Sequence, residues 1–113
     1  MIVAFDVDDC LIIPAVATGL PIDTPNYDTI AVYRWFQAQG HTMWVWSGGG
    51  QDYARMWAEK LGLQADAVWA KGPVSDDGVS APYKPDIAFD DCIVDLATVN
   101  VRVKRLNNQR KRQ

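Results

Sequence analysis

Two pairs of acidic residues in this chain follow short apolar runs. Asp6 and Asp8 come after the first run, and Asp90 and Asp91 come after a later one. If both runs are parallel strands, their carboxyl ends meet at one edge of a sheet and the acids converge. Converging carboxylates raise one another's pKa unless a cation compensates, and oxygen ligands favour a hard ion. The spacing therefore predicts a Mg²⁺ site at this edge.

Hydrogen-bond donors suited to a phosphate group accompany these acids. Ser47 and Gly48 end another apolar run, and Lys84 precedes the run that leads to the second acidic pair. A hydroxyl, a glycine backbone N–H and an ammonium group are the donors that a phosphate needs. Lys71 also follows a predicted strand and is the alternative to Lys84 as the phosphate-binding lysine.

The apolar pattern predicts strands that alternate with helices. The residues at 41–46 are apolar on both faces, as expected for a strand covered by helices on each side. The pattern predicts an α/β fold with a doubly wound, mostly parallel sheet in a three-layer α/β/α arrangement. The predicted strands are 2–6, 41–46, 67–70 and 87–89, with an edge strand near 99–103; the helices are 28–39 and 51–61, and the loops are 11–27 and 72–85.

Charge divides the chain into an acidic body and a basic end. Residues 102–113 hold six of the eleven basic residues and no acid, which leaves five basic against fourteen acidic residues in 1–101. We expect one domain at 1–101 and a basic tail at 102–113. The tail is either a disordered, solubilising terminus or a segment that attracts a polyanion such as a nucleic acid.

Several classes of protein are disfavoured by the composition. No apolar run reaches about 18 residues, and the N-terminus has no signal-like charged and apolar regions, so we expect a cytoplasmic protein without membrane contact. Cys10 and Cys92 have neither CxxC spacing nor nearby histidines, which predicts two free thiols.

The order of these motifs resembles that of the haloacid dehalogenase superfamily over about residues 2–91. Asp6-Val7-Asp8 is similar to the first motif of the family, Ser47 to the second, Lys84 to the third, and Asp90-Asp91 to the fourth. The resemblance implies that Asp6 is the nucleophile and Asp8 the general acid and base. It also implies that Asp6, Asp8 through its main-chain carbonyl, and Asp90 or Asp91 hold Mg²⁺.

The resemblance also implies a reaction. The second Asp of the first motif is typical of members that dephosphorylate, so the expected activity is phosphomonoester hydrolysis through an aspartyl-phosphate. Only about 20 residues separate Asp8 from the first predicted helix, which leaves no room for a cap domain. An open site is compatible with a small phosphorylated molecule or a macromolecular end, and the sequence does not fix the oligomeric state.

Two functions from other classes stay open on the sequence. A receiver-like signalling domain also gathers acids, a hydroxyl and a lysine on a doubly wound sheet. Its phosphorylated Asp is expected to end a middle strand, where this chain has Ser47. The other alternative is a catalytically degenerate module that binds phosphate or nucleic acid.

Overall fold

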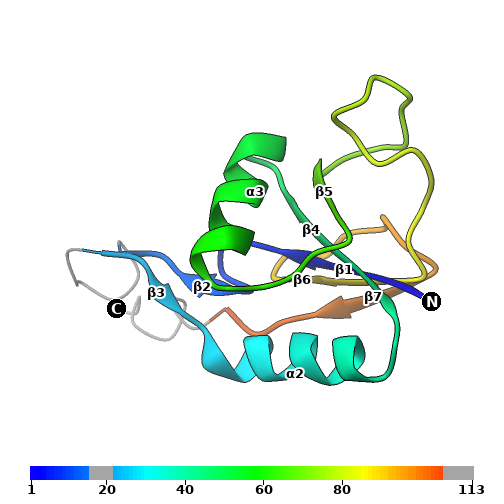
Figure 1. Ribbon diagram of the computed structural model, residues 1–113. Coiled ribbons are helices and arrows are strands. Elements are labelled where there is room, and N and C mark those ends of the chain that lie inside the picture. The colour runs from blue at the N-terminus through cyan, green and yellow to red at the C-terminus, as the bar shows by residue number, and fades with distance from the viewer. Residues whose placement is uncertain (16–21, 106–113) are drawn as a thin grey trace.

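The protein, seen here as a computed structural model describing residues 1–15 and 22–105, is built on one parallel sheet (Figure 1). Its strands are β1 (Ile2–Asp6), β4 (Thr42–Ser47), β5 (Ala67–Ala70), β6 (Ile87–Asp90) and β7 (Val99–Arg102). They lie in the order β5-β4-β1-β6-β7, and every neighbouring pair is parallel. The α/β fold and the parallel sheet predicted from the sequence are therefore confirmed, including β7 as an edge strand.

The strand order reverses at β1, the central strand. The chain first moves outward from β1 to β4 and β5, and then crosses back to β6 and β7 on the other side. This is the doubly wound order, in which ligands bind near the carboxyl ends of the strands at the point of reversal. The acidic residue that ends β1 therefore lies at the position where this class of sheet carries its site.

Both described helices cover the same face of the sheet. They are α2 (Tyr27–Ala38) and α3 (Gln51–Lys60), and each forms a crossover in the outward direction from β1. Right-handed crossovers in one direction put their helices on one face. Phe5 and Val45 of the sheet share one apolar cluster with Tyr33 of α2 and Trp57 of α3. The Phe5 ring also stacks on Phe89 with centroids 4.5 Å apart.

Within residues 1–15 and 22–105, loops cover the opposite face, so the described chain does not show the second helical layer of the predicted three-layer arrangement. Trp44, Trp46 and small alanines of the strands pack there against Ala81 and Ala97, which lie in loops. The crossover from β5 to β6 contains three prolines, which cannot continue a helix. The connection from β6 to β7 spans only 91–98, which is too short for a crossover helix and the two loops that would join it to the strands.

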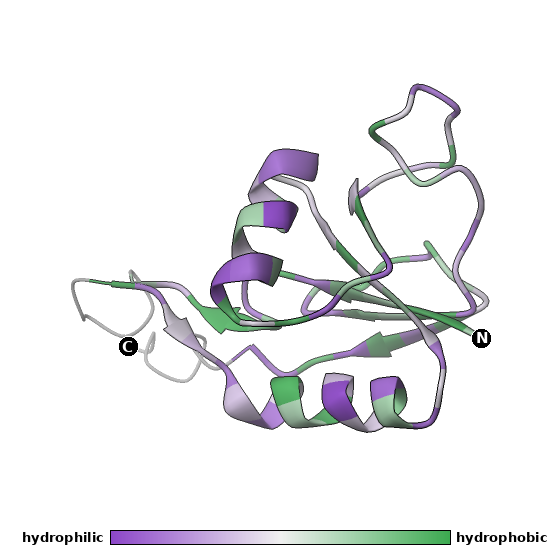
Figure 2. Cartoon of the chain, viewed as in Figure 1, coloured by the Kyte–Doolittle hydropathy of each residue, from purple (hydrophilic) through white to green (hydrophobic). Residues whose placement is uncertain are grey.

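Side-chain polarity follows this layering. Figure 2 shows β1 largely hydrophobic, whereas α3 presents hydrophilic residues along much of its length. In the loop predicted at 11–27, two short strands, β2 (Ile12–Ile13) and β3 (Thr24–Pro25), pair in antiparallel fashion. None of the described helices combines the length and the apolar character needed to cross a bilayer. The basic tail predicted from 102 begins inside β7, and its residues 106–113 lie outside the described part of the chain.

Candidate active site at the carboxyl ends of the strands

Asp6 and Asp90 lie side by side at the end of the two central strands. In the register of β1 and β6, Phe5 is opposite Phe89, so the next residue on each strand is an aspartate. Both are buried, with 4% of Asp6 and 1% of Asp90 exposed. Two buried carboxylates at neighbouring positions need a compensating cation, because neither can be solvated by bulk water.

Lys71 supplies part of this compensation. Its Nζ lies 2.8 Å from Asp90 Oδ2 and 3.3 Å from Asp6 Oδ1. The residue follows β5 directly, and its backbone N–H donates to the Ser47 carbonyl at 2.8 Å, which fixes it at the same edge. Burial lowers the pKa of Lys71, but its hydrogen bonds and attraction to Asp90 and Asp6 outweigh this and raise the pKa above its ordinary value. Lys71 therefore stays protonated between the two acids.

Lys71 alone does not neutralise the negative charge of the cluster, and the pKa of Asp6 is raised as a result. Burial and repulsion from Asp90 raise the pKa of Asp6 to about 8, although Lys71 opposes the shift. A hydrogen bond with Asp91 and repulsion from that residue raise it further. Without another cation, Asp6 is therefore held largely in its protonated form at neutral pH.

Asp91 and Cys92 continue the cluster beyond β6. Arg105 reaches Asp91 Oδ2 with both Nε, at 2.9 Å, and Nη2, at 2.6 Å. The Arg105 Nε atom also lies 3.9 Å from Asp9 Oδ2. Ligand atoms of Asp90, Asp91 and Cys92 lie within 4.8 Å of one another. Arg105 thus links the start of the basic C-terminal segment to Asp91 and to Asp9, which directly follows Asp8.

Asp8 has a separate environment two residues after Asp6. The residue is exposed, and the Tyr53 hydroxyl from α3 donates to its Oδ1 at 2.8 Å. A Cβ at Gly49 would come within 3.2 Å of the Tyr53 ring, so glycine there lets the ring lie close to the loop. Asp9 has a φ of 59°, a left-handed conformation that aspartate tolerates better than most residues. The chain folds back on itself after Asp8, because the N–H groups of Cys10 and Ile12 donate to the Val7 carbonyl.

The Ser47-Gly48-Gly49 loop lies at the same edge. Ser47 is buried and its Oγ accepts a hydrogen bond from the Gly49 N–H at 2.9 Å, whereas Gly48 is exposed. The structure thus brings Ser47 and Gly48 to the end of β4, next to the strand that carries Asp6. Through its carbonyl, Ser47 also positions Lys71.

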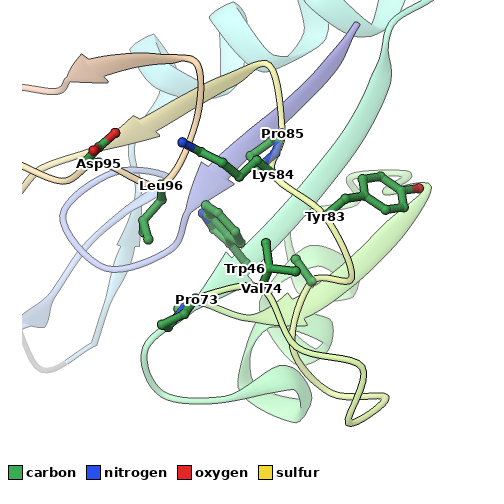
Figure 3. A pocket seen from close by; sticks show the side chains of 10 residues that line it. Trp46, Pro73, Val74, Tyr83, Lys84, Pro85, Asp95 and Leu96 are labelled. Carbon is green, nitrogen blue, oxygen red and sulfur yellow. The ribbon is translucent and has the colours of Figure 1, made fainter.

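Lys84 does not join the carboxylates. It is exposed, it precedes β6 at the opposite end of the strand from Asp90, and it lines a pocket beside Trp46 (Figure 3). Lys71 occupies the position expected for Lys84 in the sequence analysis. The signal that separates them is their position along a strand, because only a residue that follows a strand lies at the carboxyl edge.

Tyr53 and Arg105 were not predicted as site residues. Tyr53 falls within the helix predicted at 51–61, and Arg105 is one charge of the predicted basic tail. Their contacts with Asp8 and Asp91 join segments 45 and 14 residues apart in sequence. No local spacing in the sequence marks such contacts.

The described site has an excess of negative charge that fits a divalent cation. Asp6, Asp90 and Asp91 offer carboxylate oxygens, and among residues 1–15 and 22–105 only Lys71 and Arg105 form ion pairs with them. Burial and repulsion from Asp90 raise the pKa of Asp6 although Lys71 lowers it, which agrees with incomplete compensation of the charge. Carboxylate oxygens are ligands that hard cations such as Mg²⁺ prefer, whereas the Cys92 thiol beside Asp90 and Asp91 is a softer donor. Both cysteines are free thiols, with Cys10 buried and Cys92 exposed.

Replacing Lys71 should destabilise the protein more than replacing Lys84. In EDTA, we expect Lys71→Met to lower the free energy of unfolding by about 3 kcal/mol or more, because Asp90 stays buried without its partner. The matched variant Lys84→Met should change it by less than about 0.5 kcal/mol, because its side chain is on the surface. Urea unfolding at pH 7 measures both. Equal effects would contradict the assignment of Lys71 to the site.

The raised pKa of Asp6 predicts how stability depends on pH in EDTA. Between about pH 4 and pH 8, the folded protein holds a proton on Asp6 that the unfolded chain has released. The contribution of Asp6 to stability is therefore complete below pH 4 and is lost as the pH rises to 8. The free energy of unfolding should therefore fall less steeply between pH 4 and pH 8 for Asp6→Asn than for the unmodified chain. Identical slopes would show that Asp6 does not carry this proton.

Comparison of the chain with protein-family models, with curated proteins and with solved structures finds no match.

Proposed function

We propose that this protein is a Mg²⁺-dependent phosphomonoester hydrolase that works through an aspartyl-phosphate on Asp6. The observation that carries the proposal is the meeting of Asp6, Asp90 and Lys71 at the point where the strand order reverses. The two acids come from the motifs that resemble the first and fourth of the haloacid dehalogenase superfamily. Lys71 takes the phosphate-binding role that the sequence analysis gave to Lys84.

The charge of the site supports a resident cation. Asp6, the Asp8 main-chain carbonyl, and Asp90 or Asp91 would hold Mg²⁺, which supplies positive charge for the nucleophile and for the phosphoryl oxygens. Asp6 needs this charge because a carboxyl group with a pKa of about 8 is a poor nucleophile at pH 7 while it is protonated.

Each residue then has a distinct task. Asp6 attacks phosphorus in line, and Asp8 first gives a proton to the leaving oxygen and later takes one from the hydrolytic water. Lys71, the Ser47 hydroxyl and the exposed Gly48 backbone N–H stabilise charge on the phosphoryl oxygens. The exposure of Asp8 suits this task, because an exposed carboxyl group exchanges protons readily with the solvent.

The strand order argues against the receiver-like alternative. Receiver-like sheets have the order 2-1-3-4-5, in which the first strand is not central. Here the first strand of the sheet, β1, lies at the centre with two strands on each side. Asp6, which is the proposed nucleophile, therefore ends the central strand.

Steady-state turnover of p-nitrophenyl phosphate tests the proposal against both alternatives. With millimolar Mg²⁺, we expect many turnovers per chain, and EDTA should abolish them. A receiver would accept phosphate once per chain from a small phosphodonor such as acetyl phosphate, without further turnover. A binding module would neither turn over nor become phosphorylated, and either outcome would overturn the proposal.

A further inference from the structure

A pocket of about 170 Å³ lies on the face of the sheet where the loop residues Ala81 and Ala97 pack (Figure 3). Trp46 forms its centre, and its other walls come from the loop after β5, the residues before β6 and the connection to β7. A cavity of about 150 Å³ is enough to hold benzene. The pocket therefore has room for one six-membered ring with small substituents.

Polar groups accompany these apolar walls. Lys84 and Asp95 both line the pocket, and within residues 1–15 and 22–105 neither takes part in an ion pair or a side-chain hydrogen bond. Lys84 is a donor and Asp95 an acceptor, so together they match a ligand edge with an acceptor beside a donor. The indole Nε1 of Trp46 is also buried without a hydrogen-bond partner among the described residues.

The pocket adjoins the carboxylate site. Trp46 is the register partner of Asp6, on strands that are about 4.8 Å apart. Alternation along β1 and β4 puts both side chains on the same face, because Phe5 and Val45 point to the helices. Gly72 and Pro73, which line the pocket, follow Lys71 directly. A molecule with its phosphate at Asp6 would thus have its organic part beside this pocket.

We propose that the pocket binds the organic part of the phosphomonoester, and that this part is a single flat ring with a carbonyl acceptor next to an N–H donor, as in a pyrimidine. The inference rests on the proposed function and adds a substrate class to it. A purely alkyl group would leave Lys84 and Asp95 unused, and a purely anionic group would be repelled by Asp95. The volume of about 170 Å³ matches one six-membered ring better than two fused rings.

Uridine, which has no phosphate, tests the pocket without any catalysis. When uridine is titrated into the full chain, we expect the indole N–H signal of Trp46 to shift in ¹H–¹⁵N spectra. Lys84→Gln and Asp95→Asn should each weaken binding about tenfold, since a hydrogen bond to a charged group is lost. Both residues are exposed, so neither variant should unfold the protein. Lys60→Gln removes the same charge on α3 and should bind uridine as the unmodified chain does.

Turnover provides the second arm. Uridine 5′-monophosphate should have a kcat/KM at least tenfold above that of ribose 5-phosphate, and Lys84→Gln should reduce this preference to about one. If p-nitrophenyl phosphate is hydrolysed but uridine leaves Trp46 unchanged, or adenosine binds as well as uridine, the pocket inference is wrong and the proposed function stands. If uridine binds as expected but no phosphomonoester is hydrolysed, the proposed function fails and the binding site remains.

Discussion

Asp6→Asn should abolish turnover of every phosphomonoester and prevent an aspartyl-phosphate from forming. The substitution keeps the shape of the side chain but removes the oxygen nucleophile, so only slow background hydrolysis is left. Acid-quenched mass spectrometry of the intact chain detects the phosphorylated intermediate, and steady-state assays measure the loss of kcat. We expect no added phosphate on the variant under conditions in which the unmodified chain becomes labelled.

The structure provides controls for this experiment. Asn at position 6 replaces a carboxyl group that is buried and largely protonated in the absence of metal, so the variant should stay folded in EDTA. Asp28→Asn is a matched change on the exposed surface of α2, and it should retain full activity. A fully active Asp6→Asn without any modification would disprove the assignment of the nucleophile and with it the proposed mechanism.

Asp8→Asn should slow hydrolysis of an alkyl phosphate by roughly 10²- to 10⁴-fold, the range of general acid and base catalysis. The variant keeps Asp6 and the main-chain carbonyl of residue 8. With p-nitrophenyl phosphate, the leaving group needs little protonation, so the first step should suffer less than hydrolysis of the intermediate. The phosphorylated chain should therefore accumulate with this substrate, and acid-quenched mass spectrometry measures it.

Tyr53→Phe tests whether the hydrogen bond from Tyr53 to Asp8 supports proton transfer by Asp8. This variant retains the carboxyl group of Asp8 but removes the hydroxyl that donates to it. We expect a loss of kcat smaller than that of Asp8→Asn, and again larger for the alkyl phosphate than for p-nitrophenyl phosphate. An equal loss with both substrates would mean that Tyr53 affects the fold of the loop instead. An Asp8→Asn variant that hydrolyses both substrates at the unmodified rate would remove Asp8 from the mechanism.

The sequence predicted the strands well because their signal is local. β1 and β5 have the predicted bounds, and β4 differs by one residue at each end. The helical cover of both faces could not be inferred from the apolar pattern of 41–46, because loops bury that face of the strand as completely as helices do. Apolar periodicity therefore reports burial, and it does not identify the element that provides it.

The site was predictable where its residues end strands. Asp6 and Asp90 converge because parallel strands share one carboxyl edge. Lys84 lies at the other end of β6 from Asp90 because it precedes that strand, and the order of motifs along the chain does not reveal this. Tyr53 and Arg105 reach the site only through tertiary contacts, which depend on where α3 and the end of β7 are packed.

The loop-covered face has a further consequence for the dynamics of the protein. Loops that lack helical hydrogen bonds open locally at a lower free energy than the strands beneath them. The connection from β5 to β6 begins at Lys71, and the connection from β6 to β7 begins at Asp91. Amide hydrogen exchange should therefore be fast along both connections and slow in β1 and β4. The loop amides would exchange by local opening, without unfolding of the sheet. Lys71 and Asp91 would then lie at the boundary between the rigid strands and loops that open locally while the sheet stays folded.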